Sequence, residues 1–203
     1  MTDKPRMVVG ISGATGVIYG VKLLHMLKTI GIETHLVMSR TAEITLAYES
    51  SLKVTDVQNL ATVHYRIDDL AAAVSSGSFR TMGMIVAPCS ARCLAEIATC
   101  AGNNLLTRAA DVTLKERRRL VLMLRETPLH LGHIRNMATV TEMGGIIAPP
   151  APAFYTRPQS LEDMVEQSVG RVLDLFDLDI GTIPRWGKDV GPEPRSTMPQ
   201  TTP

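Results

Sequence analysis

The sequence predicts a single α/β domain, a doubly wound parallel sheet of the Rossmann or flavodoxin-like kind with helices on both faces. Short apolar runs of strand length alternate with segments whose apolar residues recur at helical spacing, an order typical of parallel sheets. The chain has 203 residues, 45% hydrophobic and 20% charged, which suits one globular domain. Gly, Pro, Ser and Thr accumulate near the end, so we expect one domain over residues 1–187 and a flexible tail over 188–203.

Each expected element rests on its own local pattern. Buried apolar runs predict five strands, at residues 7–11, 34–38, 84–87, 120–124 and 146–148. Ser39 and Ser160 are placed to cap helices, and Thr55 with Gln58 has the spacing of a capping box. Helical periodicity predicts helices at residues 17–30, 40–48, a short one near 55, 91–98, 105–117, 130–143 and 160–176.

Charge and cysteine content exclude several classes of protein. The formal net charge of +1 gives no global reason to expect a nucleic acid or acidic membrane partner. No signal-peptide core and no uncharged run of about 18 residues is visible, so no membrane span is expected. Three cysteines within twelve positions suit a reducing cytoplasm, and without an obvious fourth ligand they do not suit zinc. We therefore expect a cytoplasmic protein without a metal.

The first candidate site is the glycine-rich turn 10–16, after the first strand. Such a turn brings the backbone close to an anion, and the following helix directs free N–H groups at a phosphate. The pattern departs from the dinucleotide fingerprint because position 12 is Ser, and the second strand ends in Ser39-Arg40 rather than an acidic residue. Arg40 would suit NADP, but no tyrosine has a lysine four residues on, as a short-chain reductase requires. A mononucleotide phosphate is favoured, and glycines that serve only a tight turn remain an alternative.

Other candidates follow the later strands, where ligands sit in this architecture. Pro88-Cys89-Ser90 offers a hydroxyl and N–H groups, although no histidine is linked to Cys89 as a base would be. A charged pair, Arg125-Glu126, follows the fourth expected strand, with a surface ion pair as the alternative. Arg108, Asp111 and Lys115 share one face of a predicted helix, and a solvated helix face is the structural alternative for them. Tyr155 lies in a proline-rich loop, for which a rigid connector is the alternative.

Taken in order, these segments resemble the UbiX-like flavin prenyltransferases. The matching pieces are I-S-G-A-T-G-V-I-Y-G, V-M-S-R with Glu49 ten residues beyond Ser39, P-C-S, R-A-A-D-V-T-L-K-E-R-R, L-R-E-T-P-L-H, P-A-F-Y-x-R-P-Q-S and P-R-W-G. They run from about residue 8 to residue 187, and the ordered set is highly specific. One departure is Thr15, where many members have Ser.

The resemblance implies that the chain joins a dimethylallyl group from the monophosphate to reduced FMN, for use by a UbiD-like decarboxylase. It implies catalytic roles for Glu49, Glu126, Lys115 and Tyr155, and large homo-oligomers, probably dodecamers, with sites between subunits. The residues that it implies for FMN are Gly13, Ala14, Thr15, Ser39, Ser90, Ala91, Arg92, Cys93 and Arg125. Those that it implies for the prenyl phosphate are Arg108, Lys115, Glu126, Tyr155 and Arg171.

Two other functions remain open from the sequence. An FMN-dependent decarboxylase of the cysteine-peptide type would need a catalytic histidine, and neither His25 nor His35 is expected at the carboxyl end of a strand. A flavin-binding subunit without catalysis would keep the glycine-rich turn and lose the charged pocket, yet Lys115, Glu126 and Tyr155 are all present.

Overall fold

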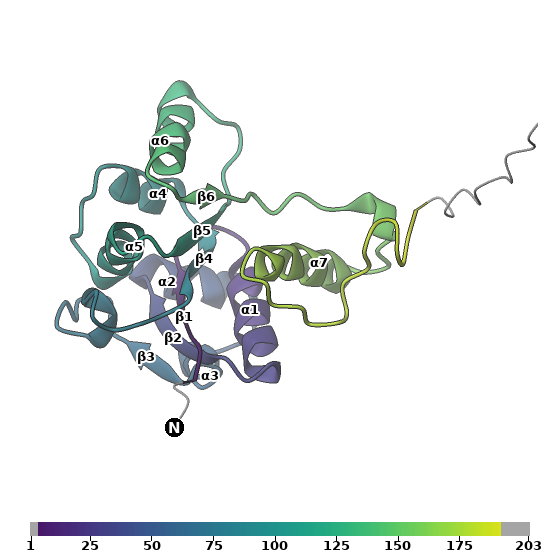
Figure 1. Ribbon diagram of the computed structural model, residues 1–203, viewed down its shortest axis with the longest axis horizontal. Coiled ribbons are helices and arrows are strands. Elements are labelled where there is room, and N and C mark those ends of the chain that lie inside the picture. The colour runs from purple at the N-terminus through teal and green to yellow at the C-terminus, as the bar shows by residue number, and fades with distance from the viewer. Residues whose placement is uncertain (1–3, 192–203) are drawn as a thin grey trace, which may run out of the picture.

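A computed structural model describes residues 4–191 and confirms the predicted α/β fold (Figure 1). All strand pairs are parallel and form one six-stranded sheet in the order β3-β2-β1-β4-β5-β6. The order reverses between β1 and β4, which is where a doubly wound sheet opens a crevice for ligands. The strands are β1 Arg6–Ile11, β2 Glu33–Met38, β3 Val63–Tyr65, β4 Gly83–Cys89, β5 Arg119–Leu124 and β6 Ile146–Ile147.

Helices cover both faces of this sheet, as expected (Figure 1). The helices α1, α2, α3 and α7 pack on one face and α4, α5 and α6 on the other. The α-helices are α1 Val17–Thr29, α2 Arg40–Glu49, α3 Val54–Gln58, α4 Ala91–Ala98, α5 Leu105–Lys115, α6 Leu131–Glu142 and α7 Leu161–Asp174, and short 3₁₀ turns lie at η1 Ala73–Ser75 and η2 Phe154–Thr156.

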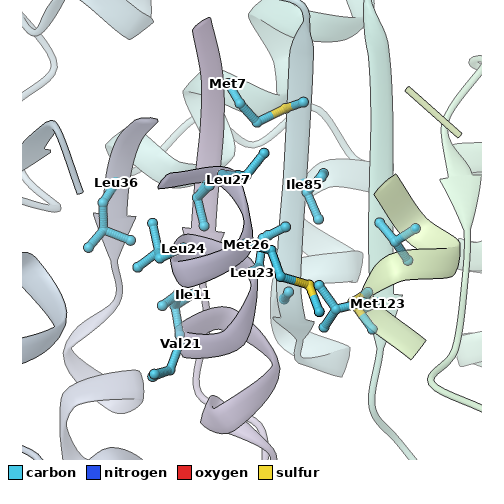
Figure 2. Close-up of a cluster of buried hydrophobic side chains, with 14 of the residues drawn as sticks. Met7, Ile11, Val21, Leu23, Leu24, Met26, Leu27, Leu36, Ile85 and Met123 are labelled. Atoms are coloured by element: carbon cyan, nitrogen blue, oxygen red, sulfur yellow. The ribbon is translucent and has the colours of Figure 1, made fainter. Parts of the chain in front are cut away.

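Two hydrophobic cores follow from the alternation of side chains along each strand. In β1, Met7, Val9 and Ile11 join the core beneath α1 and α7, while Val8 joins the core beneath α4 and α5. Figure 2 shows the first core, in which leucines of α1 lie against residues from β1, β2, β4 and β5. Because strands buried on both faces read as continuous apolar runs, these four were recognisable from sequence.

Two local expectations were wrong. The strand β3 was not predicted, because two of its three residues are only partly buried, the third is exposed, and they form no apolar run. Thr55 does not cap α3: that helix begins one residue earlier, and the Asp56 carboxylate accepts a hydrogen bond from the backbone N–H of Lys53 at 2.8 Å. Ser39 and Ser160 do cap their helices, and each hydroxyl oxygen accepts from a backbone N–H three residues on.

The segments after β6 extend away from the sheet and then return along it (Figure 1). Tyr155 in η2 meets Trp186 edge to face, with ring centroids 5.4 Å apart, so the segments before and after α7 contact each other. Of the expected tail, residues 188 and 189 complete a turn that begins at Gly187, whose N–H donates to the Val190 carbonyl at 2.7 Å. Residues 192–203 lie outside the described part of the chain. Within residues 4–191, none of the helices combines the length and apolar character that crossing a membrane requires.

Candidate functional site

The candidate site is a cavity of about 220 Å³ at the carboxyl ends of β1, β2 and β4. Ser12 ties the first and last of these strands together at its base. The Ser12 hydroxyl donates to the Pro88 carbonyl at 2.9 Å and accepts from the Ser90 N–H at 2.7 Å. Residues from the loop after β1, from the starts of α2 and α4, and from α5 line the cavity: Ser12, Gly13, Ser39, Arg40, Thr41, Ile67, Ser90, Arg92, Cys93, Glu96, Asn104, Leu106 and Thr107.

Two helix N-termini meet at this cavity. Ser39 caps α2 and Ser90 caps α4, each by accepting one backbone N–H bond, from Ala42 at 3.1 Å and from Cys93 at 3.2 Å. The other first-turn N–H groups have no partner within their helices, and the helix dipoles add positive potential there. The arrangement suits a phosphate.

The glycine-rich turn lies against the start of α2. A Cβ atom built on Gly13 would lie 2.3 Å from the Thr41 side chain, so only glycine fits. The first N–H groups of the helix that follows the turn are occupied within the chain, whereas the sequence interpretation took them as free for a phosphate. The N–H groups of Gly16 and Val17 donate to the Glu49 carboxylate at 2.9–3.0 Å, so this carboxylate occupies the N-terminus of α1. The N-termini exposed to the cavity are those of α2 and α4 instead.

Arg125 lies close to the same crevice. Its backbone N–H donates to the Cys89 carbonyl at 2.9 Å, which holds the end of β5 against that of β4. Tyr19 of α1 is near enough for the two side chains to interact electrostatically. Burial raises the pKa of the Tyr19 phenol, and the Arg125 charge opposes that rise. The tyrosine is therefore a neutral hydrogen-bonding group at neutral pH.

The side chains expected to hold a prenyl phosphate are not gathered within one chain. Arg108 pairs with Asp111 at 2.6 Å and Lys115 with Glu116, while Glu126 accepts a hydrogen bond from the Thr127 N–H at 3.0 Å. The Lys115 side chain ends α5 just before β5 begins, whereas Glu126 follows the end of β5. The two therefore lie toward opposite ends of β5, Lys115 near its amino end and Glu126 at its carboxyl end.

Tyr155 lies in η2, in the segment that extends from the sheet after β6, and Arg171 lies in α7. Arg171 pairs with Asp174, and both Tyr155 and Arg171 are exposed. Within residues 4–191, no hydrogen bond or ion pair joins either of them to Lys115, Arg108 or Glu126. One chain thus supplies these charged groups in three separate places.

Of the FMN residues expected from sequence, Gly13, Ser39, Ser90, Arg92 and Cys93 line the cavity. The neighbouring expected residues Ala14, Thr15, Ala91 and Arg125 are not among its lining residues. Cys89 is buried, and its contact with Cys93 together with burial raises the pKa of its thiol well above the ordinary value, so a nucleophilic thiolate is disfavoured.

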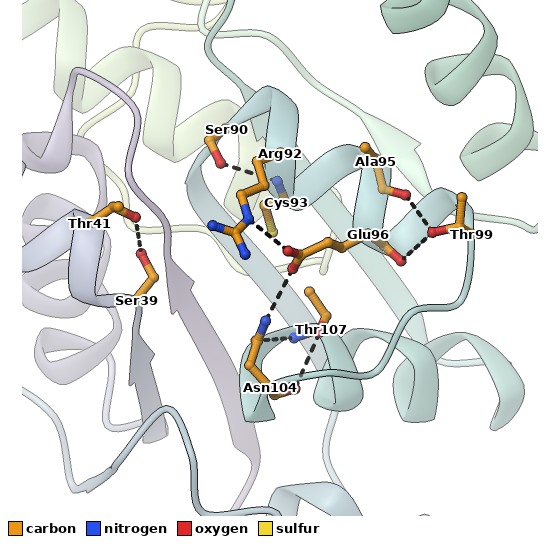
Figure 3. Close-up of polar contacts among 10 residues, drawn as sticks. All are labelled: Ser39, Thr41, Ser90, Arg92, Cys93, Ala95, Glu96, Thr99, Asn104 and Thr107. Carbon is orange, nitrogen blue, oxygen red and sulfur yellow. Dashed lines mark hydrogen bonds and ion pairs between the residues drawn. The ribbon is translucent and has the colours of Figure 1, made fainter.

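Sequence reasoning missed five polar residues that line the cavity: Ser12, Thr41, Glu96, Asn104 and Thr107. Ser12 was noted only as a departure from a glycine pattern, and Glu96, Asn104 and Thr107 lie inside or just before helices with no motif around them. The side chains of Glu96 and Asn104 form a connected group with Arg92, and the Thr107 backbone N–H donates to the Asn104 side chain (Figure 3). The signal that was available is the Asn104 to Thr107 spacing, which is that of an N-cap.

The chain is similar to known proteins along most of its length. The profile of the Flavoprotein family matches residues 1–173. A flavin prenyltransferase UbiX of Thauera aromatica is 56% identical over 181 residues, covering 89% of this chain and 93% of that protein. The chain is a UbiX-family flavin prenyltransferase.

Solved structures of the family agree with the fold of this chain. AnUbiX (PadA1), in complex with FMN and dimethylallyl pyrophosphate, has a TM-score of 0.90 at 53% identity and covers 91% of this chain and 98% of its own. A dodecameric FMN-dependent UbiX-like decarboxylase from Escherichia coli O157:H7 has a TM-score of 0.87 at 47% identity, covering 89% and 98%. The similarity spans the sheet, both helical layers and the candidate cavity.

Proposed function

We propose that this UbiX-family protein joins a dimethylallyl group from dimethylallyl monophosphate to reduced FMN, and that the product serves a UbiD-like decarboxylase. The observation that carries this is the cavity at the switch point between β1 and β4, where two helix N-termini meet. The structure of AnUbiX, at 53% identity, is a complex with FMN and dimethylallyl pyrophosphate, which supports FMN and a dimethylallyl donor as the ligands here.

The residues present suit FMN. The backbone around Gly13, Ser39 and Ser90 would hold the phosphate, with Arg92 supplying charge, and Thr15, Ala91, Cys93, Ala14 and Arg125 would complete the site. Gly13 lines the cavity, which supports a turn shaped for a ligand, while its close approach to Thr41 is a packing requirement within the chain. Reduced FMN supplies the electron-rich ring that accepts the allylic group. The protein must bind it, orient it and exclude water.

The charged side chains act on the phosphate that leaves. Breaking an allylic C–O bond places charge on that phosphate, and Lys115, Arg108, Arg171 and the Tyr155 phenol would stabilise it. Glu126 would carry a proton to the phosphate, and Glu49, beside the glycine-rich turn, would serve the later ring closure. A monophosphate needs fewer cations than a diphosphate, which is why no metal is invoked.

A decarboxylase of the cysteine-peptide type is less well supported by the positions of its candidate histidines. His35 lies within β2, where Glu33 and Tyr65 bond both of its ring nitrogens at 2.9 Å. His25 is exposed on α1. A flavin carrier without catalysis is opposed by the retained charged groups. A reducing cytoplasmic location is supported by three free cysteines within the described chain.

The deciding experiment measures the mass of the flavin after anaerobic incubation with FMN, a reductant and dimethylallyl monophosphate. We expect FMN plus one C₅H₈ unit, and only when all three are present. The pyrophosphate ester run in parallel shows which leaving group is used. An unchanged flavin mass with both esters contradicts the proposal, and carbon dioxide release from a cysteine-ended peptide would favour the decarboxylase.

A further inference from the structure

Glu96 places a carboxylate in a cavity that is otherwise suited to an anion. Its side chain is only 18% exposed and lines the cavity from α4. A carboxylate close to a bound phosphate would weaken binding unless its charge is balanced. The neighbours of Glu96 therefore decide what it does.

Both Glu96 carboxylate oxygens have partners (Figure 3). Oε1 accepts from Arg92 Nε at 2.8 Å, and Oε2 accepts from Asn104 Nδ2 at 3.1 Å. Asn104 is itself fixed, because its Oδ1 caps α5 by accepting from the Thr107 N–H at 3.0 Å. With one amide atom committed to the cap, Nδ2 must face Glu96. The carboxylate is thus anchored to the start of α5 and grips Arg92.

The hydrogen bond from Arg92 Nε to Glu96 leaves the two terminal nitrogens of Arg92 available to a ligand. Only Nε is engaged by Glu96, neither Nη group is joined to the carboxylate, and one of the two points toward the side of the cavity where Ser39 and Thr41 lie (Figure 3). Arg92 is 84% exposed, and such a side chain has many rotamers when unpaired. An ordinary i,i+4 surface pair contributes little, but here one partner is largely buried and anchored by a third residue.

We propose that Glu96 is a positioning residue, which holds the Arg92 guanidinium over the cavity so that its terminal N–H groups meet the phosphate of FMN. The proposal rests on the proposed function, since it takes FMN as the ligand. Guanidinium and phosphate form charge-assisted, geometrically specific hydrogen bonds, so orienting Arg92 in advance strengthens binding. Glu96 strengthens anion binding although it is itself an anion.

The direction in which a substitution of Glu96 changes FMN affinity separates positioning of Arg92 from simple repulsion of the phosphate. If Glu96 orients Arg92, Glu96→Ala weakens FMN binding by about threefold or more, as coupled neighbours typically do, and Glu96→Gln falls between Ala and wild type. If Glu96 only repels the phosphate, both variants bind FMN more tightly. Riboflavin, which lacks the phosphate, should bind all three proteins equally. Glu142→Gln, at the far end of α6, is the control for a lost carboxylate.

A double-mutant cycle completes the test. In an Arg92→Ala background Glu96 has nothing to orient, so adding Glu96→Gln should no longer weaken FMN binding and should tighten it by removing an unbalanced charge. Titration of purified protein by flavin fluorescence at fixed salt measures each dissociation constant, and Glu96→Gln keeps the test available if Glu96→Ala does not fold. Unchanged or tighter FMN binding by Glu96→Gln in wild type, or an equal loss for riboflavin, overturns this inference alone. Failure of wild type to bind FMN overturns the proposed function as well.

Discussion

At the scale of the residue, the charged side chains that the family resemblance singles out have the clearest outcome to test. We expect Lys115→Ala and Glu126→Gln to lose prenyl transfer by about a hundredfold in rate, the usual effect of removing a contact aimed at developing charge. Both residues are exposed, so the free energy of unfolding should change by no more than about 0.5 kcal/mol. Single-turnover flavin spectroscopy under anaerobic conditions measures the rate.

The two variants should also differ from each other. Glu126→Gln keeps a polar group of the same shape and removes a proton carrier, so the rate falls more than prenyl-phosphate affinity. Lys115→Ala weakens both. Lys28→Ala, which removes an exposed lysine from the last turn of α1, is the matched control. If Lys115→Ala or Glu126→Gln prenylated FMN at the control rate, the substituted residue would be a solvated surface group without a role in prenyl transfer.

At the scale of the element, the packing of α1 on the sheet depends on one glycine. A Cβ atom built on Gly20 would lie 2.4 Å from the Ala87 carbonyl oxygen, which is backbone and cannot move aside. We expect Gly20→Ala to lower the free energy of unfolding by about 1–3 kcal/mol, as overpacking does. Gly102→Ala is the control, because its nearest neighbour would be 3.8 Å away. Equal denaturation midpoints for the two variants would contradict the close packing.

Asp163, at the start of α7, should make the free energy of unfolding depend on pH. Backbone N–H bonds from Gln159 and the Ser160 cap lower the pKa of the Asp163 carboxyl. A lowered folded-state pKa means that the ionised group stabilises the fold above its unfolded value, about 3.9, and that this stabilisation is lost as pH falls through the folded value. Wild type should therefore be more stable than Asp163→Asn at neutral pH, and the difference should shrink only below about pH 4. Urea unfolding across pH 2–7 measures it, and a difference that vanishes already near pH 6 would point to another group.

Most elements were predictable because their patterns are local. Buried strands show as apolar runs and Ser39 and Ser160 show as caps, whereas β3 is too short and too exposed to leave a pattern. The turn 10–16 and the Pro88–Ser90 segment were recognisable because strand ends mark the site in this architecture. The Arg92–Glu96–Asn104 group was not, since it exists only once α4 and α5 are packed side by side. Glu49 was named as a candidate through the family resemblance, but its position at the start of α1 was not predictable, since its partners lie 32 and 33 residues away.

At the scale of the whole molecule, separation of the charged groups predicts an obligate oligomer. We expect a large homo-oligomer, a dodecamer as in the Escherichia coli relative, and little activity in any isolated chain. Exposed apolar side chains on α2, α6 and the segments around α7 supply surface for such contacts: Ile44, Tyr48, Leu131, Ile134, Phe154, Leu161 and Trp186. Sedimentation that shows a fully active monomer at micromolar concentration would contradict this.

Mixed oligomers offer a sharper test of shared sites. Lys115→Ala and Tyr155→Phe should each impair prenylation alone. Coexpressed with different affinity tags and purified through both, they should regain part of the wild-type rate, because some sites then take Lys115 from a Tyr155→Phe chain and Tyr155 from a Lys115→Ala chain. Doubly substituted chains, purified in the same way, are the control. No recovery in the mixture would place both groups in one chain's own site.

The carboxylate at the start of α1 has a further consequence for which nucleotides this fold accepts. The strand order is the one that dinucleotide-binding proteins use, and in those the pyrophosphate rests on the N-terminus of the first helix. Here Glu49 already sits there as an internal surrogate for that anion. A dinucleotide would have to evict a tethered competitor of like charge, while a mononucleotide can leave it undisturbed. Glu49 therefore favours a mononucleotide over a dinucleotide, because its carboxylate occupies the place that the pyrophosphate of a dinucleotide would take.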